Sequence, residues 1–243
     1  METAALAIAT AEPAAVIEWL ESQGLTMAAP PQERRAAVIA VLRAMVLQPP
    51  TLEQWAALAE AAEARGRLDL AAMFRLPQEP PGQAIRPALD RELLEKPVGQ
   101  RVALARRASV NMMERLVFDH DPRVIEALLA SPRVAAQAVL RIATRRPLPE
   151  AVARTILASD RWSCHYGVLR ALARNETLDD RWGVAVSMVL GPKDLEAMAG
   201  DPKATPTRRR VGRFRMLASH GAPAEVDAPL GGVFELDPLA GED

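Results

Sequence analysis

The sequence predicts an all-α protein whose second half is an α-solenoid of short helices. The first observation is compositional: aromatic residues make up 4 % of the chain, and Ala and Leu outnumber Val and Ile. Ala, Leu, Arg and Glu lose little free energy on becoming helical, whereas sheet cores favour β-branched and aromatic residues. The second observation is that prolines and small polar residues recur at short, regular intervals. The third is that each interval carries one apolar stripe at helical spacing.

Residues 1–76 predict a small N-terminal helical domain. Four helices are expected, beginning at or just after Pro13, Pro31, Thr51 and Leu68. Proline suits the first position of a helix, because a backbone N–H at that position would have no acceptor within the helix. Thr51 and Gln54 form a capping-box pair, in which the hydroxyl and the side-chain amide satisfy backbone groups at the helix start.

One unit of this domain has the spacing of a known repeat. The residues concerned are Trp55, Leu58, Ala59, Ala62, Gly66 and Ala71. This pattern resembles a single tetratricopeptide helix pair. It departs from that family because the later large residue is displaced to Phe74 and no closing proline is in register. A generic Ala-rich helical hairpin is the alternative.

Two segments are expected to lie outside the helical blocks. Residues 77–87 hold four prolines and one glycine, which disfavour helix and favour extended backbone. We interpret them as a linker. Residues 219–243 form an acidic tail of disordered composition. Within it, Val233, Phe234 and Leu236 are interpreted as a short docking motif, either for a partner or for an Arg-rich face of the chain itself.

Residues 88–218 predict the repeat domain. Helix starts are expected at Asp121-Pro122, Ser131-Pro132, Pro149, residues 160–163, Thr177 with Asp180, Gly191-Pro192 and Thr205-Pro206. From Pro122 to Pro206 these starts give six intervals in 84 residues, or about 14 residues per helix. Helices this short are not stable alone. They must bury their apolar stripes against neighbours on both sides, which is the physical basis of a solenoid.

The segments also resemble one another. Residues 128–134 are similar to residues 172–178, and Asp160-Arg161-Trp162 recurs as Asp180-Arg181-Trp182. An acid–proline start, a short Ala/Leu helix and a polar–proline break together resemble the bacterial leucine-rich repeat variant, of which HEAT-like repeats are wider relatives. Some members of that family carry an iron–sulfur cluster. The cluster needs about four thiolates, and Cys164 is the only cysteine, so this feature does not carry over.

Charge and hydropathy limit the possible partners and the location. The net charge of −1 argues against a whole-molecule nucleic-acid binder, although residues 101–174 hold thirteen Arg and six acids, a local excess of +7. No apolar run approaches the ~18 residues of a membrane helix. The N-terminus has no basic region typical of a signal peptide. We therefore expect a cytoplasmic protein that does not bind a membrane.

The side chains that could perform chemistry are few. They are Cys164 with His165, His120 between Asp119 and Asp121, and the pair Asp179 and Asp180. Sequence neighbours on a helix point about 100° apart, so the first pair is interpreted as a core thiol beside a half-buried histidine. The acids are interpreted as helix caps and first-turn residues. No catalytic, metal-binding or cofactor-binding site is expected, and the protein is interpreted as not an enzyme.

The candidate partner-binding residues are arginines and tryptophans. They are Arg145, Arg146, Arg161, Trp162, Arg170, Arg174, Arg181, Trp182, Arg208, Arg209 and Arg210. Arg and Trp are the residues that most often dominate binding energy at interfaces. The run of five arginines between 208 and 215 is expected to face solvent. For the two tryptophans, core packing is the alternative, and for the arginines the alternative is a face that is only solvated.

These residues lead to two functional hypotheses. The first is a scaffold or adaptor that binds another protein along the solenoid. The alternative is nucleic-acid binding, since HEAT-like DNA glycosylases are similar in size and use Arg and Trp on a concave face. No specific motif of those enzymes aligns with this chain.

Overall fold

The computed structural model describes residues 11–22, 31–75 and 91–219, and all regular structure in these ranges is helical. Fourteen helices and no strands occur in this part of the chain. The predicted all-α class is therefore confirmed. The predicted linker and the tail motif at Val233, Phe234 and Leu236 lie outside the described residues.

The N-terminal helices begin where the sequence predicts. They are α2 (Pro13–Leu20), α3 (Pro31–Leu47), α4 (Leu52–Ala64) and α5 (Leu68–Phe74). The capping box of α4 is present: Gln54 N donates to Thr51 Oγ1 at 3.3 Å, and Thr51 N donates to Gln54 Oε1 at 2.8 Å. Gly66 follows α4 with a φ of 67°, a left-handed conformation that favours glycine and lets the chain turn into α5.

Ten further helices follow from Arg91. They are α6 (Arg91–Leu94), α7 (Val98–Arg106), α8 (Val110–Leu116), α9 (Pro122–Leu129), α10 (Ala136–Ala143), α11 (Glu150–Ala158), α12 (Tyr166–Ala173), α13 (Asp180–Ser187), α14 (Pro192–Ala199) and α15 (Pro206–Ser219). The starts predicted at Pro122, Pro149, Pro192 and Pro206 agree with the structure to within one residue. Asp121 caps α9 by accepting from Arg123 N at 2.9 Å.

Two predicted helix starts are wrong because a turn comes first. Ser131 Oγ accepts from Arg133 N at 3.4 Å in a local turn, and α10 begins only at Ala136. The segment around Asp160 is also a turn, and His165 rather than an earlier residue caps α12. Both segments have the short polar side chains that favour caps and turns alike, so the sequence did not distinguish the two.

The third wrong start concerns Thr177. The cap of α13 is Asp179, which accepts from Arg181 N at 2.8 Å. The Thr177 hydroxyl instead pairs with Asn175 Oδ1 at 2.7 Å and accepts from Leu148 N at 3.0 Å. It therefore joins two neighbouring turns.

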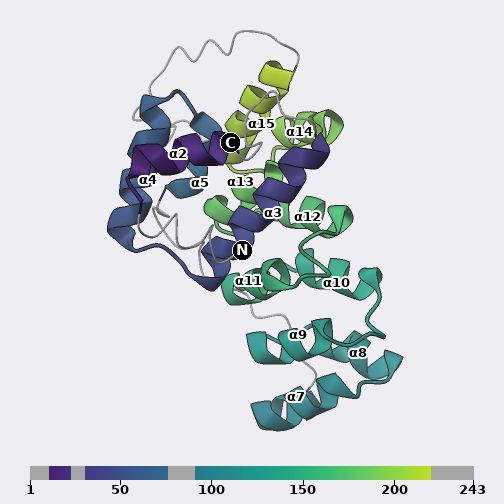
Figure 1. The fold of residues 1–243 in the computed structure, drawn as a ribbon. Coiled ribbons are helices and arrows are strands. Elements are labelled where there is room, and N and C mark those ends of the chain that lie inside the picture. Colours follow the sequence, from purple (N-terminus) through teal and green to yellow (C-terminus); the bar gives the residue numbers. More distant parts are fainter. Residues whose placement is uncertain (1–10, 23–30, 76–90, 220–243) are drawn as a thin grey trace, which may run out of the picture.

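The helices from α7 onward follow one another up the molecule in chain order (Figure 1). Helices two apart in the sequence pack together: α7 on α9, α9 on α11, and α10 on α12. Hydrogen bonds between them join residues about 30 positions apart. For example, Trp162 Nε1 donates to Leu129 O at 3.2 Å, and Trp182 Nε1 donates to Glu150 Oε1 at 3.0 Å.

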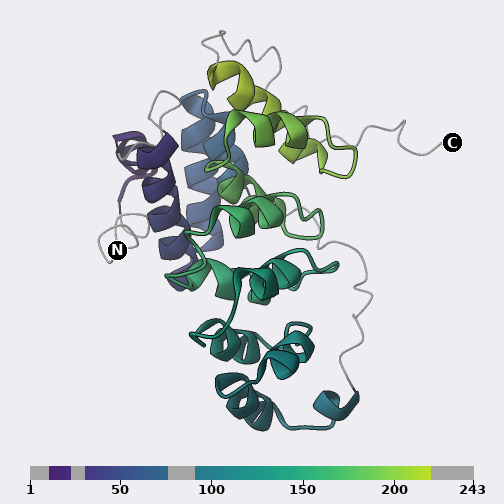
Figure 2. The ribbon, with the colours of Figure 1, turned by 90° about the vertical axis from the view of Figure 1, so that its right-hand side faces the viewer.

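The N-terminal helices pack on the later helices rather than on the nearest ones in the sequence. Helix α3 contacts α11 and α13, and α5 contacts α13 and α15. Figure 2 shows the N-terminal helices, coloured purple to blue, to the left of the upper part of the teal-to-yellow column. One cluster of buried apolar residues runs through both parts. A buried ion pair between Asp69 and Arg215, at 2.6 Å, ties α5 to α15.

Three buried side chains perform the same task at successive levels of the column. Each donates to two backbone carbonyls, one on or next to the last residue of a helix and one two residues later. The bonds run from Arg145 to Val117 O (3.1 Å) and Asp119 O (2.7 Å), from Asn175 to Ala143 O (2.9 Å) and Arg145 O (2.7 Å), and from Arg208 to Ala173 O (3.2 Å) and Asn175 O (2.5 Å). We call this set of bonds the carbonyl ladder. It supplies donors to carbonyls at and just after the helix ends, where the intrahelical donors run out.

Candidate functional site

Four of the predicted partner-binding residues are buried, which corrects the prediction for them. Trp162 and Trp182 are each 2 % exposed, Arg145 is 6 % exposed and Arg208 is fully buried. The tryptophans donate to Leu129 O and Glu150 Oε1, and the two arginines belong to the carbonyl ladder. Core packing, the alternative for the tryptophans, is therefore what the structure shows.

The arginine run on α15 does not face solvent as a whole. Arg208 and Arg215 are buried, Arg209 and Arg210 are half-buried, and Arg213 is exposed. The solvent-facing prediction is wrong because α15 packs on α5, α13 and α14. Within that contact Arg208 pairs with Asp180 at 2.9 Å. Burial lowers the pKa of the Arg208 guanidinium, and the negative charge of Asp180 opposes that shift.

Arg161 and Arg181 are used within the fold. Arg161 donates to Val134 O at 3.1 Å, and its guanidinium lies 4.3 Å from the ring centroid of Trp162. Arg181 is half-buried and lies 5.1 Å from the ring centroid of Trp55 on α4. Cation–π contacts of this kind stabilise by about 0.5–2 kcal/mol each. These two arginines connect elements of the fold.

Three predicted residues meet in an open groove. Arg146, Arg170 and Arg174 line a hollow of about 670 Å³ formed by α10, α12 and the turn between α14 and α15. Arg141 and Lys203 also line it, and sequence reasoning missed both. Arg141 precedes Arg170 by 29 residues, close to the two-helix period, and that spacing was the signal that could have found it. We call the hollow lined by these five residues the basic groove.

Each arginine of the basic groove has an acidic partner at its edge. The pairs are Arg141 with Glu114 (3.4 Å), Arg146 with Glu176 (2.6 Å), Arg170 with Asp194 (3.8 Å) and Arg174 with Asp201 (3.6 Å). The four arginine side chains are 46–51 % exposed. Ion pairs exposed to this degree stabilise by only about 0–1 kcal/mol, so an incoming carboxylate can replace these partners at little cost.

Two residues set the charge at one end of the groove. Burial raises the pKa of the Glu176 carboxyl, but the hydrogen bond and charge of Arg146 outweigh it and hold the pKa below its usual value. Lys203 has no carboxylate within 4 Å of its ammonium group among the described residues. Its ammonium group is therefore available to a ligand.

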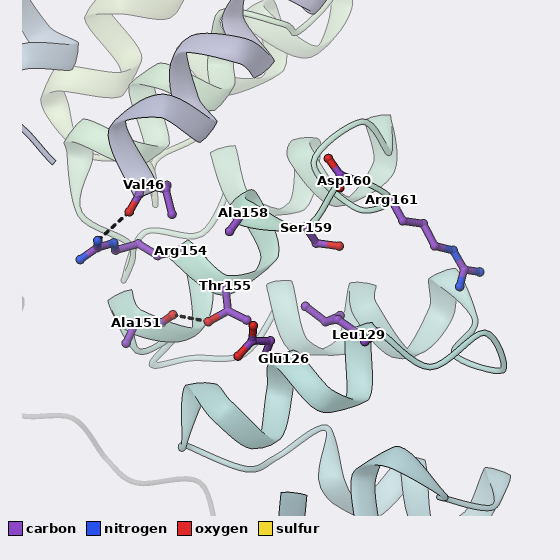
Figure 3. Close-up of a pocket in the computed structure, with 11 residues that line it drawn as sticks. Val46, Glu126, Leu129, Ala151, Arg154, Thr155, Ala158, Ser159, Asp160 and Arg161 are labelled. Carbon is purple, nitrogen blue, oxygen red and sulfur yellow. Dashed lines mark hydrogen bonds between the residues drawn. The ribbon is translucent and has the colours of Figure 1, made fainter. Parts of the chain in front are cut away.

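A second pocket lies where the end of α3 meets α9 and α11 (Figure 3). Its volume is about 600 Å³, and it is lined by both acids and bases, among them Glu126, Arg154 and Asp160. Arg154 donates to Val46 O at 2.9 Å, and Asp160 pairs with Arg43. In Figure 3 the Arg161 side chain points away from Val46 and Arg154. Arg154 and Asp160 therefore connect α11 and the turn after it to α3.

The residues considered for chemistry are separated or act as caps. Cys164 is exposed, so the prediction of a core thiol is wrong; the turn that precedes α12 carries it outward. His165 Nδ1 accepts from Val168 N at 3.4 Å as the cap of α12. His120 Nδ1 lies 3.1 Å from Arg145 Nη2. In the described ranges no three His, Cys, Asp or Glu residues are arranged to hold a metal ion.

Comparison with protein-family models, curated proteins and solved structures found no match. Among the described residues, no helix has the length and apolar character that crossing a membrane requires.

Proposed function

We propose that this protein is a non-enzymatic cytoplasmic scaffold of the helical-repeat class, and that it binds an acidic segment of a partner protein in the basic groove. The observation that carries the proposal is the groove itself. Its five cationic side chains come from three successive levels of stacked helices and converge on one open hollow. A single helix could not supply such a row.

The carbonyl ladder supports the repeat interpretation. Its acceptor carbonyls occupy equivalent places at the ends of α8, α10 and α12. Such a regular arrangement is what a solenoid of the leucine-rich repeat variant or HEAT-like type requires, because each unit contacts its neighbours and little else. A regular stack also fixes the spacing of side chains on its surface.

The chemistry of the groove favours carboxylates. The planar Arg guanidinium donates two parallel hydrogen bonds to a carboxylate, and such charge-assisted bonds are about twice as strong as neutral ones. Arg170 and Arg174 already pair with carboxylates, those of Asp194 on α14 and Asp201 in the turn after it. Leu140 and Ala171 line the groove between the arginines and provide apolar contact area.

Nucleic-acid binding is less well supported. Stacking on bases needs exposed aromatic rings. Trp162 and Trp182, the tryptophans that could have served, are buried. The acids that border the groove would repel phosphates, and the net charge of −1 gives no long-range attraction.

The test is a direct binding measurement on the full chain. A fluorescent peptide rich in Glu and Asp is titrated with protein, and its Gln/Asn analogue serves as the neutral probe. The double variant Arg170→Glu with Arg174→Glu should weaken binding at least about tenfold, because attraction becomes repulsion at two contacts. The matched control is Arg106→Glu with Arg107→Glu, two exposed arginines at the C-terminal end of α7, outside the groove.

Three results would decide the proposal. The proposal is supported if the protein binds the acidic probe but not the neutral one, and if this binding is lost in the groove variant and kept in the control. Equal weakening in both variants would mean that only overall charge matters. Tighter binding of a DNA duplex that depends on Arg170 and Arg174 would favour the nucleic-acid alternative.

A further inference from the structure

We infer that the chain's own C-terminal segment, residues 221–243, is a competing occupant of the basic groove and regulates access to it. This inference rests on the proposed function of the groove. It concerns how the groove is controlled rather than which partner it binds.

The C-terminal segment and the basic groove carry opposite charges. Residues 221–243 contain six acids and no Lys or Arg. The groove presents Arg141, Arg146, Arg170 and Arg174 about half exposed, with Lys203 beside them. The same chain therefore carries both a carboxylate-binding surface and a segment rich in carboxylates.

The C-terminal segment also contains apolar residues among its acids. In Val233-Phe234-Glu235-Leu236-Asp237, apolar side chains stand beside carboxylates. The groove offers the matching combination, since Leu140 and Ala171 lie among its arginines. A purely electrostatic contact would not need Phe234, whereas Leu140 and Ala171 in the groove lining give its ring an apolar surface to cover.

The C-terminal segment is attached to the chain within reach of the groove. Helix α15 packs on α14, and the turn that joins them carries Lys203 and Asp201 at one end of the groove. The last described residue, Ser219, ends α15. From there to Phe234 is 15 residues, which span up to about 50 Å when extended. The groove is therefore within reach of the segment that follows α15.

Covalent attachment makes a weak contact effective. A segment joined by a short linker has an effective concentration of about 1 mM for its neighbour. If the isolated segment binds the groove with a Kd of about 0.1–1 mM, it raises the apparent Kd of an acidic partner about 2- to 11-fold. Exposed ion pairs of this kind weaken with salt, so the competition should decline as ionic strength rises.

The first experiment measures competition in the full-length chain. The tail-neutral variant replaces every tail acid by its amide: Glu225→Gln, Asp227→Asn, Glu235→Gln, Asp237→Asn, Glu242→Gln and Asp243→Asn. The acidic probe should bind this variant about 2- to 11-fold more tightly than the unaltered chain at low salt. The difference should shrink at high salt. Equal affinities for the two chains at both salt levels would overturn the inference and leave the proposed function intact.

The second experiment places the tail directly. Cys164 is exposed and is the only cysteine, so a nitroxide can be attached there without changing the sequence. It lies three residues before Gly167, which lines the groove, so the label is within about 11 Å of it along the chain. NMR signals of residues 233–237 should broaden. The broadening should disappear in the Arg170→Glu, Arg174→Glu variant and persist in the Arg106→Glu, Arg107→Glu control.

The two experiments separate the two ideas. If the probe binds neither the unaltered chain nor the tail-neutral variant, the proposed function fails. The nitroxide experiment then tests tail docking by itself. Broadening that requires Arg170 and Arg174 supports tail docking, and the absence of broadening overturns it.

Discussion

Gly183 on α13 leaves the space through which the side chain of Arg208 on α15 reaches the backbone carbonyls after α12. A Cβ atom at position 183 would overlap with Nε and Cζ of Arg208. The guanidinium donates to Ala173 O and Asn175 O, so it has little freedom to move aside. A glycine in the middle of a helix normally destabilises it. Here it permits the last step of the carbonyl ladder.

Gly183→Ala should therefore lower the free energy of unfolding by about 1–3 kcal/mol, the usual cost of overpacking. Urea denaturation followed by circular dichroism measures it. The control is Gly99→Ala on α7, where an added Cβ meets nothing within 4 Å. That change should be neutral or stabilise by up to about 1 kcal/mol. Equal stability of the two variants would show that Arg208 is not held in place.

Asn175→Ala should destabilise the protein by about 2 kcal/mol, because it leaves the carbonyls of Ala143 and Arg145 buried without this donor. Asn175 is fully buried between two levels of the column. The control, Asn111→Ala, alters an exposed residue on α8 and should change stability by less than about 0.5 kcal/mol. A similarly small effect at position 175 would mean that the ladder contributes little.

Helix starts could be predicted from the sequence wherever a proline and a cap act locally. Pro122 and Thr51 are examples, because their effect involves only residues within one turn. Ser131 and Thr177 were assigned wrongly because the same side chains also serve turns. The partner of the Thr177 hydroxyl, Leu148 N, lies 29 residues away and no local pattern marks it.

The basic groove could be predicted in part, and for the same reason. Arg170 and Arg174 lie four residues apart on one helix face, which the sequence shows directly. Arg208 and Arg215 also have helical spacing, but they are buried because of contacts with Asp180 and with Asp69, which lies 146 residues from Arg215. Helical periodicity gives the faces of a helix, and only the packing of distant elements decides which face is covered.

The ion cluster around Asp69 should make stability depend on acid pH. Burial raises the pKa of the Asp69 carboxyl, but the charges of Arg215 and Arg67 outweigh it and keep the pKa below its ordinary value. A carboxyl whose pKa is lower in the folded state stabilises fully above its unfolded pKa, near 4. That stability is lost as pH falls through the folded value.

Asp69→Asn should thus lower the free energy of unfolding by about 3–5 kcal/mol at pH 7, because it removes the buried carboxylate that pairs with both Arg67 and Arg215. The difference in free energy of unfolding between the variant and the unaltered protein should become smaller as pH drops below about 4. Urea midpoints at neutral and acid pH measure both effects. Asp160→Asn is the matched control: its side chain is 82 % exposed, so its loss should cost less than about 1 kcal/mol. If the difference in free energy of unfolding between Asp69→Asn and the unaltered protein does not change with pH, the lowered pKa of Asp69 is contradicted.

Cys164 should react with a thiol reagent at the rate of an open thiol, since it is exposed in the turn before α12. One equivalent per chain should be modified without denaturant, and helix content should not change. Unfolding the protein in urea should raise the rate only slightly. Reaction that requires urea would show that the thiol is buried.

The N-terminal helices should remain bound after the chain is cut between the two blocks. Six of the seven residues of α5 are buried, and α5 packs on α13 and α15 as well as on α4. The Asp69–Arg215 ion pair and the Arg154–Val46 hydrogen bond cross the same boundary. None of these contacts depends on the peptide that joins the blocks.

A protease recognition sequence placed within residues 77–87 provides the cut. The two fragments should elute together in gel filtration at about 1 µM and separate only in denaturant, because an apolar contact continuous with the core requires no covalent link. The Asp69→Asn variant, cut in the same way, should dissociate at a lower urea concentration, since the carboxylate that joins α5 to Arg215 of α15 is then missing. Fragments that separate in native buffer would show that the shared core is too weak to join the blocks, and that the linker holds them together.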